Sequence, residues 1–336
     1  MTEKVLSLKK REVVDALLQG RNGSPSDAGH AFAPVNIALC KYWGKRDSEL
    51  NLPINSSLSI SLDRLGAETT VTPIDSPRDR FFLNDLEVDL EDDAGRRVAD
   101  YLDLLRPSPA ARYRVDSHSD VPVAAGIASS ASGFAALALA LNDLFGWGLE
   151  RRELSILARL GSGSAARSVY DGFVEWHAGQ RADGMDCFAE RIDAEWKDLR
   201  IALVEISDSP KPIGSRPAMA RTVETSRLYS GWPRRADEDI GEIRAAISGR
   251  DIERLGAAAE SNALAMHATM LDSRPPILYW KPATLAAIEK VWHLRDDGSA
   301  VYLTMDAGPN LKLVFEKTTR PQVEAAFPGA RIVAPF

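Results

Sequence analysis

The first half of the chain alternates apolar and polar residues in short runs, the pattern of half-buried β-strands. Residues 57–62 show it most plainly, since Leu58, Ile60 and Leu62 would share one face of a strand. Similar runs predict further strands at residues 33–39, 68–72 and 170–176. Helical spacing of apolar residues predicts helices at residues 94–105, 129–145 and 150–160. We therefore expect the chain to begin as a sheet accompanied by helices.

The second half is richer in helical periodicity. It opens with an apolar run at residues 199–206, a predicted strand, and continues with predicted helices at residues 218–228, 237–247 and 251–270. Another helix is expected at residues 284–295, with Pro282 in its first turn and Gly298 at its end. Shorter predicted elements complete the chain, namely strands at residues 300–305, 311–315 and 331–334 and a helix at residues 320–327. Helices and strands do not alternate regularly, so the fold class is α+β rather than doubly wound α/β.

Length and composition predict two folded domains after a short arm. The 336 residues are 45% hydrophobic and 26% charged, which is ordinary globular usage. Residues 5–18 are amphipathic and lead into a stretch rich in Gly, Ser and Pro, which we interpret as a linker without chemistry of its own. The longest apolar stretch, Phe134–Leu141, is far shorter than the roughly 20 residues of a membrane-spanning helix. We expect a cytoplasmic protein that does not contact membranes.

Charge and residue usage narrow the function classes. Lys and Arg number 41 against 48 Asp and Glu, for a net charge of −7, so a nucleic-acid partner is not expected. A local cluster of cations could still bind a small anion. The two cysteines, Cys40 and Cys187, lie far apart, and the five histidines show no metal-binding spacing. Neither a disulfide nor a zinc site is predicted.

One loop has the composition of an anion site. Residues 121–133 read VPVAAGIASSASG and lead directly into the alanine-rich predicted helix at 129–145. Unpaired backbone N–H groups and the positive end of the helix dipole favour a phosphate at such a point. A plain serine-capped helix explains the same residues about equally well. The spacing matches neither the P-loop nor the dinucleotide-binding pattern.

Three further segments place cations beside small or hydroxylated residues. Lys41, Tyr42, Lys45 and Arg46 follow the predicted strand at residues 33–39. The other two segments are residues 161–168, GSGSAARS, and the pair Ser215 and Arg216. Each lysine or arginine alone is best explained as a solvated surface charge. Several together, each beside Gly or Ser, favour a site for phosphate or carboxylate.

A carboxylate stands at the end of one predicted strand. Asp306 follows the apolar run at residues 300–305 and lies in the turn sequence DAGPN. Aspartate commonly caps such turns, which is the ordinary explanation. A carboxylate held beside a lysine such as Lys41 could instead orient or deprotonate a hydroxyl group.

Taken together, these segments resemble the mevalonate diphosphate decarboxylases of the GHMP kinase superfamily. The resemblance runs from Ala33 to the carboxyl end and rests on motifs in the family's order: NIALCKYWGKRD, LNLPINSSLSISL, PVAAGIASSASG, GSGSAARSVYDGFVEW, SRPAMARTVETS and MDAGPN. It implies a two-domain GHMP kinase-like α+β fold, with an amino-terminal domain resembling domain 2 of ribosomal protein S5 and a ferredoxin-like carboxyl-terminal domain. The implied division is an arm at residues 1–29 and domains at 30–185 and 186–336.

The resemblance also implies a reaction. ATP phosphorylates the 3-hydroxyl of mevalonate 5-diphosphate, and phosphate and CO2 then leave to give isopentenyl diphosphate. Asp306 and Lys41 are the implied catalytic residues, and Gly126, Ser129 and Ser130 the implied ATP-phosphate loop. The implied substrate ligands are Tyr42, Lys45, Ser162, Ser164, Arg167, Ser215 and Arg216, with Arg167 at the carboxylate. ATP and Mg2+ are expected, with no metal ligand identified, and a homodimer is implied.

The chain departs from the family pattern near the expected substrate. Gly214 stands where the family often has the first of two serines, and Pro217 and Ala218 replace an acidic or polar residue and a glycine. These changes leave open a phosphomevalonate decarboxylase that forms isopentenyl phosphate. Two further alternatives, which do not depend on these changes, are a kinase that stops at the 3-phosphate and a ligand sensor without catalysis.

Overall fold

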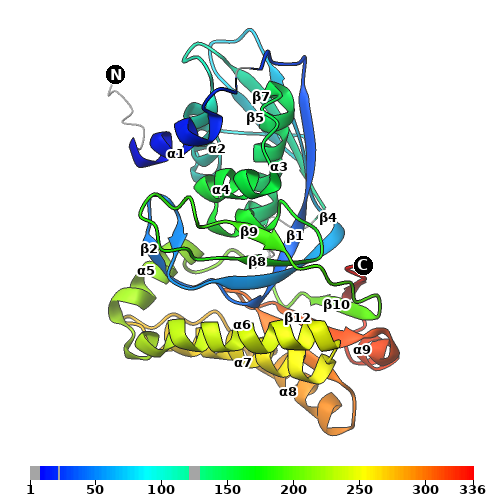
Figure 1. Ribbon diagram of the computed structural model, residues 1–336. Coiled ribbons are helices and arrows are strands. Elements are labelled where there is room, and N and C mark those ends of the chain that lie inside the picture. Colours follow the sequence, from blue (N-terminus) through cyan, green and yellow to red (C-terminus); the bar gives the residue numbers. More distant parts are fainter. Residues whose placement is uncertain (1–7, 22, 121–128) are drawn as a thin grey trace.

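The computed structural model describes residues 8–21, 23–120 and 129–336 (Figure 1). In this part of the chain the first half forms a seven-stranded sheet in the order β6-β5-β7-β4-β8-β9, with β1 also paired to β4. All pairs are antiparallel except β5 with β7. The strands are β1 (Gly29–Cys40), β4 (Ser57–Pro73), β5 (Arg80–Leu83), β6 (Leu86–Val88), β7 (Tyr113–Ser119), β8 (Phe173–Trp176) and β9 (Ala189–Arg191).

Helices cover one side of this sheet. They are α1 (Leu8–Leu18), α2 (Asp93–Leu105), α3 (Ser129–Phe145) and α4 (Arg151–Gly161), followed by the short helix η1 (Gly163–Arg167). Alanines along α3, such as Ala135 and Ala138, are fully buried, and their small size lets this helix lie close to β1 and β4. A capping box between Glu150 and Glu153 begins α4.

The second half forms a four-stranded antiparallel sheet in the order β11-β12-β10-β13. Its strands are β10 (Leu199–Val204), β11 (Val301–Met305), β12 (Leu311–Glu316) and β13 (Arg331–Val333). The accompanying helices are α5 (Ser215–Thr225), η2 (Arg227–Gly231), α6 (Trp232–Gly249), α7 (Ile252–Leu271), α8 (Pro282–Asp296), η3 (Lys317–Thr319) and α9 (Arg320–Ala326). The predicted α+β class with two domains is confirmed.

The two halves share a hydrophobic core where β1 ends. Val35, Ile37 and Leu39 on β1 are fully buried in the same cluster as Ala259 and Met266 on α7. In Figure 1 the lower end of β1 reaches the layer formed by α6 and α7. Residues that follow β1 therefore lie at the junction of the two halves.

Four predicted elements differ from the structure. The strands expected at residues 57–62 and 68–72 are one continuous strand, β4, which passes through an irregularity at Asp63, whose φ is 35°. The strand expected from Tyr170 begins only at Phe173, because Gly172 has a φ of 69°. The helix expected at residues 218–228 is interrupted at Ser226, whose backbone is extended.

Short strands escaped the sequence analysis. Besides β5, β6, β7 and β9, the structure contains the two-stranded hairpin of β2 (Lys45–Asp47) and β3 (Leu52–Pro53). Apart from β7 these strands have two to four residues, too few alternating positions to stand out from loops. Strand β7 has seven residues, but only Tyr113 and Val115 among them are apolar.

Candidate active site

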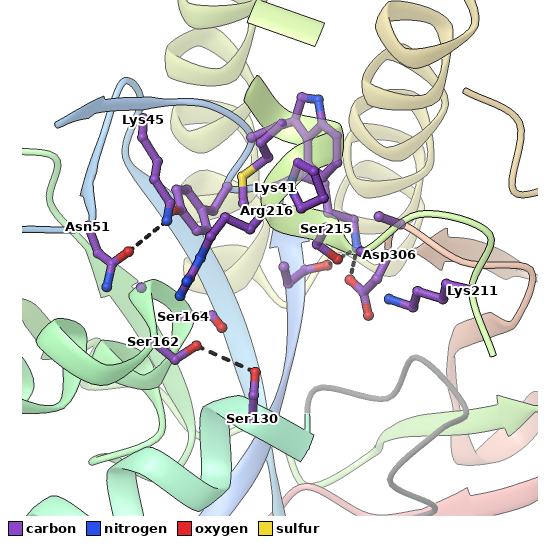
Figure 2. Close-up of a pocket in the computed structure, with 18 of the residues that line it drawn as sticks. Lys41, Lys45, Asn51, Ser130, Ser162, Ser164, Lys211, Ser215, Arg216 and Asp306 are labelled. Carbon is purple, nitrogen blue, oxygen red and sulfur yellow. Dashed lines mark hydrogen bonds and ion pairs between the residues drawn. The ribbon is translucent and has the colours of Figure 1, made fainter. Parts of the chain in front are cut away.

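A cavity of about 800 Å³ opens between the two halves. Its walls include the end of β1 and the segment after it, the end of α4 with η1, the start of α5, and the turn between β11 and β12, together with residues of α2, α3 and α7. The predicted residues that line it are Lys41, Tyr42, Lys45, Ser130, Ser162, Ser164, Arg167, Ser215, Arg216 and Asp306. Figure 2 labels most of them around one space. Segments more than 250 residues apart in sequence are thus brought together.

Asp306 is held between two lysines, a group that we call the Asp306 cluster (Lys41, Asp306 and Lys312). One carboxylate oxygen lies 3.0 Å from Lys41 Nζ and the other lies 2.8 Å from Lys312 Nζ. Both lysine side chains are 2% exposed, whereas the Asp306 side chain is 26% exposed. The carboxylate therefore faces the cavity, which Lys41 also lines, whereas Lys312 does not line it.

The charges in this cluster fix the ionisation of the aspartate. Burial alone would raise the pKa of Asp306, but the ammonium groups of Lys312 and Lys41 hold it far below its usual value. Burial lowers the pKa of Lys41 to about 8, although Asp306 opposes that shift. Asp306 is therefore ionised at neutral pH and is a weak base.

Neighbouring polar groups hold the backbone on both sides of this ion pair. Burial lowers the pKa of His267 to about 3, so its ring is neutral, and Nε2 donates to the carbonyl of Asp306 at 3.1 Å. The backbone N–H of Lys41 donates to Asn262 Oδ1 at 2.8 Å, and Lys41 Nζ also donates to the carbonyl of Ala38 at 2.8 Å. His267 thus supports the Asp306 turn.

Arg167 is a buried cation held by neutral partners. Its guanidinium donates to Asn36 Oδ1 at 3.0 Å and to Ser57 Oγ at 2.5 Å, and the residue is 3% exposed. Burial lowers the pKa of Arg167 to about 10, so it remains charged at neutral pH. In the described part of the chain it forms no salt bridge. An anion in the cavity would supply the missing charge.

A second group of cations lies on the other side of the cavity; we call Lys45, Asn51, Arg97 and Arg216 the Lys45 cluster. Lys45 Nζ donates to Asn51 Oδ1 at 2.6 Å, and Arg216 points toward the loop of Ser162 and Ser164 (Figure 2). Within the described residues none of its three cations forms a salt bridge. Burial lowers the pKa of Lys45 to about 8, and the charges of Arg216, Lys10 and Arg97 contribute to the same shift. This cluster is electrostatically suited to an anion such as phosphate.

Tyr42 and its surroundings show an unfilled hydrogen-bonding position. The Tyr42 hydroxyl is buried, and no partner for it exists among the described residues. A Cβ on Gly163 would lie 2.9 Å from this hydroxyl, so glycine is needed there. Ser162 and Ser164 flank Gly163 and line the same wall. A phosphate oxygen bound here would give the tyrosine hydroxyl a partner.

The predicted nucleotide loop is described only in part. Gly126 lies outside the described residues, and Ser129 is the first residue of α3. Ser130 lines the cavity, with its Oγ 3.5 Å from Ser162 Oγ (Figure 2). The amino end of α3 thus opens at the cavity, which fits an anionic phosphate group.

Metal ligands are sparse in the described residues, which contain no group of three or more His, Cys, Asp or Glu side chains suited to a metal. The carboxylates lining the cavity are Asp93 and Asp306. A magnesium ion bound here would therefore take most of its ligands from phosphate oxygens.

Comparison with known proteins identifies the family. A profile of the diphosphomevalonate decarboxylase-like N-terminal domain matches residues 33–189, and one of the mevalonate 5-diphosphate decarboxylase C-terminal domain matches residues 201–329. The human diphosphomevalonate decarboxylase is 38% identical over 331 residues, which cover 91% of this chain and 81% of the human protein. The chain belongs to the diphosphomevalonate decarboxylase family. The relative from Eremothecium gossypii, 39% identical, covers 84% of this chain and 76% of its own length.

Solved structures of the family share the fold. The decarboxylase MDDEF in complex with MVAPP, AMPPCP and magnesium is 41% identical, with a TM-score of 0.86 over 91% of this chain and 96% of its own. Mevalonate diphosphate decarboxylase from Staphylococcus aureus is 38% identical, with a TM-score of 0.86 over 92% and 95%. The resemblance inferred from the motifs is thereby confirmed. Among the described helices, none has the length and apolar character needed to cross a membrane.

Several residues of the site were missed in the sequence. The sequence could have indicated Lys312, because a lysine within the apolar run LKLVF is unusual unless an acidic partner neutralises its charge. Asn51 lies in the quoted motif LNLPINSSLSISL but was not singled out, and Arg97 and Lys211 lie in segments that gave no sign of the cavity they line. Arg46, grouped with the cations after β1, does not line the cavity and instead donates to the carbonyls of Ala178 and Arg181.

Proposed function

We propose that the chain catalyses the ATP-dependent decarboxylation of mevalonate 5-diphosphate to isopentenyl diphosphate, the activity of its family. The observation that carries this proposal is the ionised Asp306 carboxylate, which faces a cavity whose opposite wall holds unneutralised cations. A substrate with a tertiary hydroxyl at one end and phosphates at the other matches this arrangement of charges.

The first step is phosphorylation of the 3-hydroxyl group. Asp306 accepts a hydrogen bond from this hydroxyl and orients its oxygen toward the γ-phosphorus of ATP. The new O–P bond forms as the bond from the γ-phosphorus to the β,γ-bridging oxygen breaks, and ADP leaves. Because Asp306 is a weak base, it takes the proton late, when the O–P bond has made the hydroxyl more acidic.

The second step removes the 3-phosphate and CO2. The C–O bond to the phosphate breaks, and the electron pair of the bond to the carboxylate carbon becomes the new double bond. Lys41, and Lys211 on the loop before α5, supply positive charge near the leaving phosphate. Mg2+ bound with ATP would neutralise the nucleotide's phosphates.

The remaining residues bind and orient the substrates. In this proposal Arg167 contacts the substrate carboxylate, while the diphosphate is held by Tyr42, Lys45, Ser162, Ser164, Ser215 and Arg216. Gly126, Ser129 and Ser130 contact the ATP phosphates. We further propose a homodimer, tested by sedimentation, and a division into an arm at residues 1–29 and domains at 30–185 and 186–336.

The test of the proposed function is the stoichiometry of the reaction. Purified protein is incubated with ATP, Mg2+ and mevalonate 5-diphosphate, and ADP and CO2 are both quantified. One CO2 for each ADP supports the decarboxylase. A stable 3-phosphorylated product without CO2 would show a kinase, and no ADP with any phosphorylated mevalonate would show a protein that only binds its ligand.

Gly214 and Pro217 depart from the family pattern, and this departure favours testing one alternative, a phosphomevalonate decarboxylase. Pro217 lines the cavity next to Arg216, and Gly214 precedes the first residue of α5. A phosphomevalonate decarboxylase would release CO2 faster from mevalonate 5-phosphate than from the 5-diphosphate.

A further inference from the structure

Helix α1 (Leu8–Leu18), in the amino-terminal arm that the sequence predicted to have no chemistry, is docked beside the cavity. The family profile begins only at residue 33, so helix α1 (Leu8–Leu18) lies outside the matched region. Val13, Val14 and Leu17 of this helix are buried in the core cluster that also contains residues of α2 and α4. Figure 1 shows α1 next to α2, on the side of the fold where α4 ends.

One side chain of this helix contacts the wall of the cavity from behind. Lys10 Nζ donates to the carbonyl of Leu160 at 2.9 Å. Leu160 is the penultimate residue of α4, and Ser162, Gly163 and Ser164 follow it along the cavity wall. Lys10 thus holds the carboxyl end of the helix from which this wall continues.

The same carbonyl connects Lys10 with the Lys45 cluster. Asn51 Nδ2 donates to the carbonyl of Leu160 at 3.3 Å and to that of Arg159 at 2.8 Å, while Asn51 Oδ1 accepts from Lys45 Nζ at 2.6 Å. A continuous set of hydrogen bonds therefore leads from the arm, through one carbonyl and one amide side chain, to a lysine that lines the cavity.

Lys10 also adds positive charge behind this wall. Burial lowers the pKa of Lys10, and the charge of Arg216 contributes to the shift, while Asp100 and Glu49 oppose it. Lys10 in turn is one of the charges that lower the pKa of Lys45. Part of the positive potential at the Lys45 cluster thus originates in the arm.

We propose that Lys10 of the amino-terminal arm is a positioning residue for the phosphate end of the substrate, which it serves by fixing the end of α4 and the Asn51–Lys45 pair. This inference rests on the proposed function, since it assumes a phosphorylated substrate in the cavity. The arm is then a part of the binding site that the family profile does not include.

The test compares Lys10→Met with a control on the same helix, Arg11→Met. Arg11 donates to the carbonyls of Leu104 and Asp103 at the end of α2, so its loss weakens docking of the arm without touching α4. We expect Lys10→Met to raise KM for mevalonate 5-diphosphate about fivefold, with kcat within twofold and KM for ATP unchanged. Arg11→Met should leave all three constants unchanged, and Lys10→Arg should restore KM.

A purely structural role for Lys10 would give a different result. It would lower the unfolding temperature of Lys10→Met and Arg11→Met alike and leave KM for the diphosphate unchanged in both. An unchanged KM in Lys10→Met would overturn the proposal.

A binding measurement separates this inference from the proposed function. Inorganic pyrophosphate is titrated calorimetrically into the unsubstituted protein, Lys10→Met and Arg11→Met. A Kd about fivefold weaker in Lys10→Met alone supports the role of Lys10 even if the unsubstituted protein turns over no mevalonate derivative. Equal Kd values in all three proteins would refute that role, whatever the activity.

Discussion

The Asp306 cluster and the Lys45 cluster lie on opposite sides of one cavity, and they differ in whether their charges have a partner within the protein. In the Asp306 cluster two buried lysines contact one carboxylate, at 3.0 and 2.8 Å, so the aspartate's charge is met within the protein. In the Lys45 cluster the lysine is held by the neutral Asn51, and its pKa is lowered to about 8 by burial and by the surrounding cations. The aspartate of the Asp306 cluster therefore needs no ligand to balance its charge, whereas a bound anion would stabilise the cations of the Lys45 cluster.

This difference assigns the two sides different parts of the reaction. A carboxylate fixed by two ion pairs keeps its position while the substrate reacts, which is what catalysis by orientation requires. Cations without a counter-charge are stabilised most by a ligand that carries a negative charge, so this cluster favours binding of an anion. Substitutions in the Asp306 cluster should therefore change kcat, and substitutions in the Lys45 cluster should change KM.

The largest effect is expected from Asp306→Asn. The amide has nearly the same shape but neither attracts the hydroxyl proton nor accepts it, so kcat should fall about 10³-fold with KM for the diphosphate nearly unchanged. Steady-state CO2 release measures this, with circular dichroism to check the fold. Asp93→Asn removes another carboxylate from the same cavity and serves as the control, with kcat within twofold. Near-normal turnover by Asp306→Asn would show that the Asp306 cluster is not the catalytic side of the cavity.

A smaller loss is expected from Lys312→Met. One ammonium group would remain beside Asp306, so kcat should fall about 10²-fold, the equivalent of one charge-assisted hydrogen bond. The pKa of Asp306 should rise, because a lysine that holds it down is gone. Since the ionised carboxylate is the active form, the acid limb of the kcat profile should move to higher pH. Lys312→Arg should recover part of the rate, and an unshifted acid limb in Lys312→Met would argue against this account.

The pH dependence of KM tests the Lys45 cluster. The pKa of Lys45 is lowered to about 8, and its ammonium form binds phosphate, so the charge is present below that pH and lost as pH rises through it. KM for the diphosphate should therefore increase about tenfold between pH 7 and 9.5. In Lys45→Arg the guanidinium stays charged, so KM should stay flat over this range. Identical KM profiles for the two proteins would exclude Lys45 as the titrating group.

The sequence predicted the chemistry of the cavity better than its geometry. Lys41 and Asp306 were identified because each follows an apolar strand within a motif of small and polar residues. Their contact could not be derived, since it depends on two strands from different halves, β1 and β11, lying side by side, where Thr304 Oγ1 donates to the carbonyl of Ala38. Lys312 was missed for a related reason: a lysine in an apolar strand needs a buried partner, but the sequence does not indicate which residue that partner is.

The fold was predictable where periodic segments are long. Helix α3 has the boundaries expected from its alanine-rich pattern, Ser129–Phe145. Short strands such as β2 carry no period that can be recognised. The arm was misjudged for another reason: amphipathicity indicated that α1 buries one face, but nothing in its sequence indicated that Lys10 would contact the end of α4.

The Lys45 cluster is proposed to bind a diphosphate. The most direct test compares kcat/KM for mevalonate 5-diphosphate with kcat/KM for the 5-monophosphate. Both are measured as CO2 released in the presence of ATP and Mg2+. The second phosphate adds at least one charge-assisted contact to a cation of this cluster. We predict that kcat/KM favours the diphosphate by about 10²-fold. Equal values, or a preference for the monophosphate, would contradict the account.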